Sequence, residues 1–338
     1  MKILSIPVTC HGHYRPVSDI HFNSNLTNEF IILSASKDGT AIIRDGVTGD
    51  WIGSLLGHKG AIWCCRLNND SKIAFTGSGD FTAKIWDLEN GECKQTIPHD
   101  HIVRCLDLSS DSQYLVTANN KYDISLYDVN NPLKCILNKH IHEDVIRKLI
   151  VLDEGRQVLS ASDDKSLLLT DLRESSATKP AIRFNLDDNI MDFTLENEKY
   201  SENLKRALIT ITAKDEVRGM QLDFTMPSKT PDLLSKLKLD SDIFCIDTQN
   251  FYDEKSQKYQ RLILCGCISG EIFLYENWLN KEWDSEDQNK NFKECYKGHF
   301  GPVHRIKFSN QLKLKSYTLS IFASGSEDGT ETNSVYGS

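Results

Sequence analysis

The chain has 338 residues, of which 39% are hydrophobic and 26% are charged, and its 39 basic and 48 acidic side chains leave a net charge of −9. This is globular composition, without the roughly 20 consecutive apolar residues of a membrane-spanning helix or a low-complexity tract. Because no stretch is apolar enough to cross a bilayer, we expect no membrane partner. Because an acidic chain repels a phosphate backbone, we expect no direct sequence-specific nucleic-acid partner.

An internal repeat begins close to the N-terminus. Copies begin at Gly12-His13, Gly57-His58, His101, His142 and Gly298-His299, and each continues into a Ser/Thr-rich strand and an acidic turn. The first four histidines follow one another at intervals of roughly 40 to 45 residues, which is the period of a four-stranded blade with Gly-His and Trp-Asp marks.

The stretch between His142 and His299 is long enough for three intervals with insertions, and two degenerate repeats can be placed there. Their predicted strands are 190–193, 207–212 and 216–222 in the first repeat, and 243–246, 262–267 and 271–275 in the second. The count is then seven blades, which start near residues 12, 57, 100, 141, 187, 241 and 298.

Apolar residues alternate within each repeat with one short irregularity, and Asp38-Gly39 and Asp328-Gly329 provide tight hairpin turns. The sequence therefore predicts a single all-β domain, a seven-bladed WD-repeat β-propeller with blades of four antiparallel strands. An N-terminal strand, 3–8, is expected to close the last blade as its outermost strand. Residues 331–338 show no apolar alternation, and Ser334 stands in the register of Trp86, so we expect an irregular tail there.

Blade two contains a Trp, a Thr, a His and an Asp that can form a buried hydrogen-bond chain: His58, Thr76, Asp80 and Trp86. The same residue types could suggest a catalytic triad, but their periodic recurrence favours a structural role. The chain also lacks a phosphate-binding glycine loop, a nucleophile elbow and a zinc-binding spacing of its scattered cysteines. We therefore predict no enzyme activity, no cofactor and no metal, and we expect most cysteines to be small buried side chains.

The inner strands align on their first apolar residue, and the next residue in each should lie near the mouth of the central channel. These residues are Ser18, Trp63, Arg104, Arg147, Met191, Phe244 and His304. Trp, Phe and Arg dominate the energetics of protein interfaces, so we predict a protein-binding site formed by Trp63, Arg104, Arg147, Phe244 and His304. An acidic or aromatic peptide could dock there with both arginines paired to carboxylates, although the side chains could equally just fill the channel.

Loops expected to flank the same face supply second candidates, namely Tyr14, Arg15, Lys59, Phe81 and Phe300. The insertions 197–206, 250–260 and 277–292 are charged and are expected to be outer loops, the last of them with Trp278 and Trp283 as possible docking residues.

Four longer segments, residues 49–63, 80–87, 296–304 and 323–330, closely resemble the family of serine/threonine kinase receptor-associated proteins, also called unr-interacting proteins. The resemblance implies a non-enzymatic adaptor in the survival-of-motor-neuron complex, which assembles spliceosomal ribonucleoproteins, with Gemin and Sm-type partners and, in animals, a role in receptor signalling through Smad proteins. Subunit i of translation initiation factor three is the alternative, with other initiation-factor subunits as partners. We expect a monomeric chain in the cytoplasm, and leave a nuclear location open.

Overall fold

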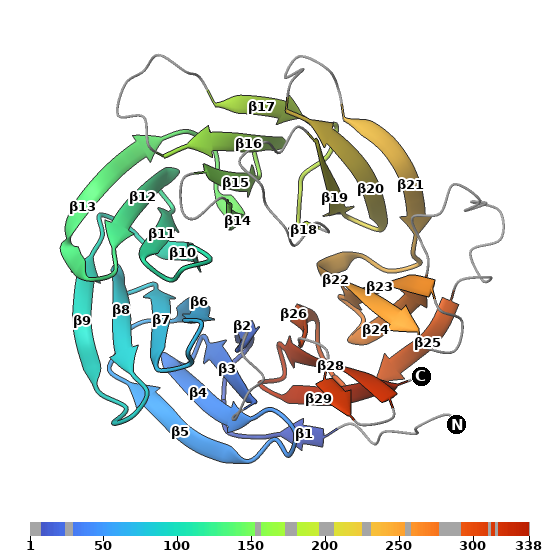
Figure 1. Ribbon diagram of the computed structural model, residues 1–338, viewed down its shortest axis with the longest axis horizontal. Coiled ribbons are helices and arrows are strands. Elements are labelled where there is room, and N and C mark those ends of the chain that lie inside the picture. The colour runs from blue at the N-terminus through green and yellow to red at the C-terminus, as the bar shows by residue number, and fades with distance from the viewer. Residues whose placement is uncertain are drawn as a thin grey trace.

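The computed structural model describes residues 8–23, 30–152, 157–172, 181–195, 206–224, 231–253, 258–276, 292–309, 312–314 and 317–337. These residues form strands and turns that close into a ring around a central channel (Figure 1). Seven sheets, each built around four antiparallel strands, form the blades of the ring, so the predicted all-β, seven-bladed propeller is confirmed. No helix that could span a membrane occurs in the described ranges.

Strands a to d of each blade run from the channel to the rim. Blade one consists of β2 (Val17–Phe22), β3 (Ile31–Ser36), β4 (Thr40–Asp45) and β5 (Trp51–Leu56). Blade two consists of β6 (Ile62–Leu67), β7 (Ile73–Ser78), β8 (Thr82–Asp87) and β9 (Cys93–Pro98). Blade three consists of β10 (Val103–Leu108), β11 (Tyr114–Asn119), β12 (Asp123–Asp128) and β13 (Asn131–His140). Blade four consists of β14 (Ile146–Leu152), β15 (Gln157–Ser162), β16 (Ser166–Asp171) and β17 (Ile182–Asn185). Blade five consists of β18 (Asp192–Leu195), β19 (Arg206–Ala213), β20 (Glu216–Asp223) and β21 (Asp232–Lys238). Blade six consists of β22 (Ile243–Asp253), β23 (Lys258–Cys267), β24 (Glu271–Glu276) and β25 (Phe292–Lys297).

Blade seven closes the ring with strands from both ends of the chain. It comprises β26 (Val303–Phe308), β28 (Tyr317–Ser326), β29 (Glu331–Gly337) and β1 (Val8–Cys10), with the short β27 (Leu312–Leu314) beside β28. Figure 1 shows the blue β1 next to the red β29, and their register pairs Val8 with Asn333 and Cys10 with Glu331. The N-terminal strand is therefore the outermost strand, as predicted, although it is observed at 8–10 and residues 1–7 lie outside the described part.

The prediction of an irregular tail at 331–338 was wrong. Residues 331–337 form strand c of blade seven and pair continuously with β28 from Gly325↔Glu331 to Leu319↔Gly337. Strand pairing is made by backbone groups, so a segment without apolar alternation can still be a strand when β28 and β1 offer hydrogen bonds on both sides. The expected outer loop at 250–260 was wrong in part for the same reason, since β22 and β23 pair from Ile243↔Cys267 to Asp253↔Lys258.

The core lies between the blades. Seven hydrophobic clusters among the described residues each join side chains of two neighbouring blades, and the cluster between blades one and two brings Leu33 and Ala41 against Ile62 and Cys65. Small residues on the second strand permit this close approach: a Cβ on Gly325 would lie 2.5 Å from Val17 of the next blade. Seven of the ten cysteines are buried, as expected for most of them, whereas Cys93 and Cys135 are exposed and Cys295 is half-buried.

Candidate functional site: the channel mouth

In six of the seven blades, a β-bulge places one side chain of the inner strand at the channel mouth. In six blades the register between strands a and b shifts by one residue, and the extra residue is Ser18, Trp63, Arg104, Arg147, Phe244 or His304. A bulge bends the strand and re-aims the extra side chain. In blade five the strand begins at Asp192, and the preceding Met191 occupies the equivalent place.

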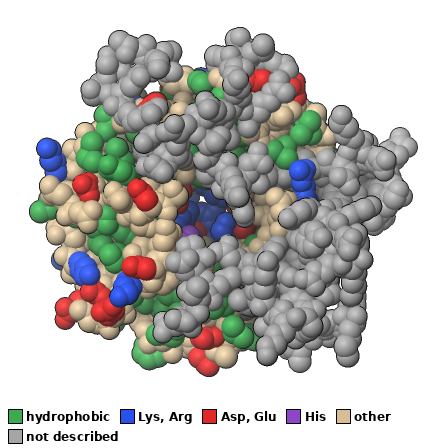
Figure 2. Space-filling view, in the orientation of Figure 1, with side chains coloured by type: hydrophobic (Ala, Val, Ile, Leu, Met, Phe, Trp, Pro, Cys, Tyr) green, Lys and Arg blue, Asp and Glu red, His purple; other side chains and the backbone are tan. Residues whose placement is uncertain are grey.

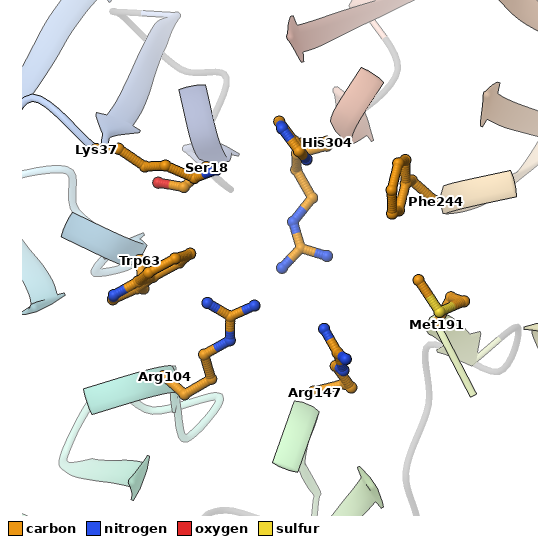
Figure 3. A pocket seen from close by; sticks show the side chains of 9 residues that line it. Ser18, Lys37, Trp63, Arg104, Arg147, Met191, Phe244 and His304 are labelled. Atoms are coloured by element: carbon orange, nitrogen blue, oxygen red, sulfur yellow. The ribbon is translucent and has the colours of Figure 1, made fainter. Parts of the chain in front are cut away.

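The structure brings all seven predicted mouth residues together. They line one cavity of about 220 Å³, to which Lys37 and Arg305 also contribute. Figure 3 shows the labelled side chains arranged around the channel and pointing inward from different blades. The broken alternation in each inner strand, such as Val17 and Ile20 both buried with two residues between them, was the sequence signal for this geometry.

One side of the mouth combines aromatic and cationic groups. The guanidinium carbon of Arg104 lies 4.0 Å from the centre of the Trp63 ring, and Lys37 Nζ lies 5.6 Å from it. Trp63 lies between these two cations in Figure 3. A cation held over an indole in this way is attracted by the ring electrons, which orders both side chains.

Acidic residues in turns beside the mouth hold two of the mouth residues in place. Arg147 makes a two-pronged contact with Asp163, with Nε to Oδ1 at 2.7 Å and Nη2 to Oδ2 at 2.6 Å. Glu327 pairs with His304 and lies 3.6 Å from Lys37 Nζ. The hydrogen bond from His304, and to a smaller extent the charge of Lys37, lower the pKa of the Glu327 carboxyl.

The opposite side of the mouth is apolar. Met191 and Phe244 come from blades five and six, and the Phe244 ring packs against the His304 ring with their centres 5.6 Å apart. The mouth therefore offers a cationic half and an apolar half within one small cavity.

Arg305 separates the mouth from a second cavity of about 210 Å³ deeper in the channel, because it lines both. Its Nε lies 2.7 Å from Asp19 Oδ1 in blade one, and its Nη1 lies 3.4 Å from Asp192 Oδ2 in blade five. Burial alone would raise the pKa of Asp19, but Arg305 and Arg66 together lower it to about 2. Figure 2 shows one end of the channel as a hollow in which Lys and Arg side chains gather.

A belt of acids below the mouth ties neighbouring blades together. Each acid accepts a hydrogen bond from a backbone N–H of the next inner strand: Asp19 from Cys65 (3.1 Å), Asp107 from Val151 (2.9 Å), Asp192 from Ile246 (3.1 Å) and Asp247 from Phe308 (2.7 Å). Basic side chains pair with the same acids, namely Arg66, Lys148, Arg305 and Lys307. These charges are thus already partnered, which makes the belt a structural element.

The blade-two tetrad has the predicted geometry. Trp86 Nε1 donates to Thr76 Oγ1 (2.8 Å), Thr76 bonds His58 Nε2 (2.7 Å), and His58 Nδ1 bonds Asp80 Oδ2 (2.8 Å). Because the ionised Asp80 carboxylate can only accept, the neutral His58 ring carries its proton on Nδ1. The bare Nε2 then accepts from the Thr76 hydroxyl, which itself accepts from the indole. Burial lowers the pKa of His58, in agreement with a neutral ring.

Blades one, four and seven repeat the His–Ser and His–Asp contacts through His13, His142 and His299. In blade three the repeat was expected to begin at His101, but the histidine of the hydrogen-bond chain is His99: its Nε2 bonds Thr117 Oγ1 at 2.9 Å, and Tyr127 takes the place of Trp. His99 follows β9 directly, where the chain turns toward the next blade, whereas the His101 ring packs against Phe81 with centres 5.3 Å apart.

The second set of candidates lies in exposed loops beside the mouth and not in it. Tyr14, Phe81 and Phe300 are 76%, 45% and 98% exposed, and Arg15 and Lys59 are exposed as well. None of the five is among the described residues that line the cavity. Sequence reasoning missed Lys37 and Arg305, because the alignment of the inner strands assigned one residue per blade to the mouth. Lys37 lies in a turn, and Arg305 is a second residue of the strand that contains His304. Trp278 and Trp283 lie outside the described residues.

The comparisons agree with this architecture. A family model described as "WD domain, G-beta repeat" matches residues 5–45, 49–87 and 91–128. The chain is similar to serine-threonine kinase receptor-associated protein of Homo sapiens, with 32% identity over 332 residues, which cover 98% of this chain and 82% of that protein. The protein of that name from Dictyostelium discoideum is 30% identical, with 96% and 97% covered. Eukaryotic translation initiation factor 3 subunit I of Saccharomyces cerevisiae is 23% identical, with 94% and 89% covered.

Proposed function

Because the chain belongs to the family of serine-threonine kinase receptor-associated proteins, we propose that it is a non-enzymatic adaptor in the survival-of-motor-neuron complex, where it holds Gemin and Sm-type proteins during spliceosomal ribonucleoprotein assembly. The observation that supports a docking role is the mouth itself. Trp63, Arg104 and Phe244 converge there from different blades, and these residue types contribute most to protein interfaces. In an animal source, receptor signalling through Smad proteins is part of the same proposal.

Two observations support an adaptor over an enzyme. Burial lowers the pKa of His58 and of His142, and both rings are members of structural hydrogen-bond chains. The propeller and the names of the relatives point to a protein-interaction scaffold. The proposed location is the cytoplasm, where such a complex would meet its partners, with the nucleus as a second location.

The test is a pull-down of the tagged protein from a lysate of its own cells, read by mass spectrometry, for the wild type and a Trp63→Ala variant. Recovery of Gemin and Sm-type proteins by the wild type, with loss by the variant, supports both the complex and the mouth. Co-purification of initiation-factor subunits would instead favour the role of translation initiation factor three subunit i, to which the chain is similar at lower identity. Full recovery by the variant would exclude the mouth as the docking site.

A further inference from the structure

The cations at the mouth differ in whether an acid already neutralises them. Three of the four are paired with carboxylates of this chain: Lys37 with Glu327, Arg147 with Asp163, and Arg305 with Asp19 and Asp192. Their charge is therefore largely balanced before any ligand arrives.

Arg104 is the exception. It forms no hydrogen bond or ion pair with any described residue, and its guanidinium rests on the Trp63 ring at 4.0 Å. Burial, and secondly the neighbouring Arg147, lower the pKa of Arg104, but a guanidinium keeps its proton under all ordinary conditions. One partly desolvated positive charge, with its donors directed by the stacking, thus stands at the mouth without an ion-pair partner among the described residues.

We propose that the mouth binds a single peptide carboxylate through the Arg104 guanidinium, with an adjacent apolar side chain against Met191 and Phe244. This inference rests on the proposed function and names the chemistry that the docking site recognises. The carboxylate belongs to a Glu or Asp side chain or to the C-terminus of a partner, since both present the same planar pair of oxygens to a guanidinium.

Charge and size favour a carboxylate over a phosphate. One unbalanced positive charge matches one negative charge, whereas a phosphate group carries nearly two and would lie close to the Glu327 and Asp163 carboxylates. Arg147 is already paired with Asp163 through Nε and Nη2, so its charge is balanced before a ligand arrives. A cavity of about 220 Å³ holds one acidic side chain and part of a neighbour.

The test uses four fluorescein-labelled heptapeptide libraries with uncharged degenerate flanks, whose binding to the purified full chain is measured by fluorescence anisotropy. The first has a central Glu and an amidated C-terminus, the second a central Gln and a free C-terminal carboxylate, the third a central Gln and an amidated end, and the fourth a central phosphoserine and an amidated end. The proteins are the wild type, Arg104→Gln, and Lys134→Gln as a control that removes the same charge from an exposed position on β13.

We expect the first or the second library to bind the wild type at least about tenfold more tightly than the third, and Arg104→Gln to remove that difference while Lys134→Gln retains it. Which of the two libraries binds distinguishes a side-chain carboxylate from a chain terminus. Tighter binding of phosphoserine than of Glu, equal binding of all libraries, or no binding below about 1 mM would each overturn the inference.

The pull-down separates this inference from the proposed function. Loss of partners with Trp63→Ala but not with Arg104→Gln would refute the carboxylate and leave the adaptor role intact. Retention of all partners by both variants would refute docking at the mouth itself. Matching circular-dichroism melting curves for the variants and the wild type establish that each protein is folded.

Discussion

The tetrad of blade two permits a matched test of buried hydrogen bonding. Thr76→Val replaces a hydroxyl with a methyl group of similar shape and removes the acceptor of Trp86 Nε1 and the donor to His58 Nε2. Both partners are in the interior, where Trp86 is 1% exposed and the His58 side chain 0%. The substitution therefore leaves two polar groups without partners and creates no cavity.

The magnitude follows from those two groups. Each buried polar group that loses its partner costs about 1–3 kcal/mol, and the added methyl group returns somewhat less than about 1 kcal/mol. We expect Thr76→Val to lower the free energy of unfolding by about 1–5 kcal/mol.

Blade four supplies the control. Thr170 is 4% exposed, and its hydroxyl forms no hydrogen bond with any described residue, so Thr170→Val removes a buried polar atom that has no partner to lose. We expect this variant to be neutral or more stable by up to about 1 kcal/mol.

Urea unfolding followed by tryptophan fluorescence and circular dichroism measures both variants, with the midpoint compared at equal m-values. A Thr76→Val protein within about 0.5 kcal/mol of the wild type would refute the energetic role of the tetrad. Equal destabilisation by both substitutions would show that any Thr→Val change in these strands is harmful, independent of hydrogen bonding.

Three further predictions concern charged groups. Arg305→Met leaves Asp19 and Asp192 buried with fewer counter-charges, so urea unfolding should show a loss of about 3–5 kcal/mol, and an unchanged midpoint would contradict this. Burial raises the folded-state pKa of Glu331, against the opposing effects of His13 and Arg44, so the stability of the protein falls through this group as the pH rises above about 4. The melting temperature of Glu331→Gln, relative to that of the wild type, should therefore increase from about pH 4 to about pH 8. A constant difference between the two melting temperatures would argue against this. Burial opposes ionisation of Asp80, but hydrogen bonds from Thr82, Lys59 and His58 lower the pKa of its carboxyl to about 2. The contribution of Asp80 to folding stability is therefore complete above about pH 4 and is lost toward about pH 2. On acidification, Asp80→Asn should lose less stability than the wild type.

The mouth was predictable because it depends on a local pattern that recurs. In six blades the inner strand carries its own bulge, and the buried residues on either side of it are visible as two apolar positions separated by two others. Once the repeats are aligned, one position per blade must face the channel. Trp63 and His304, 241 residues apart in the chain, could therefore be assigned to one site without coordinates.

The partners of the mouth residues were not predictable in this way. Asp163 and Glu327 lie in turns, and the structure shows that they occupy Arg147 and His304 while Arg104 has no such neighbour among the described residues. A sequence alignment gives two arginines equal weight. Their different availability depends on side-chain directions that only the packed ring defines.

Four longer segments of the sequence resembled the family. The repeat pattern by itself determined the all-β propeller, the number of blades and the blade-two tetrad. Each of these depends on contacts within one repeat or between adjacent ones, and such contacts leave a periodic trace in the sequence. The tertiary structure decided the features that depend on the closed ring. Residues 331–337 become a strand because β28 and β1 offer backbone partners on both sides, and Arg305 becomes the floor of the mouth because the ring brings blades one and five within its reach. Closure joins residues that are distant in sequence through backbone hydrogen bonds and single ion pairs, and neither of these has a repeating signature.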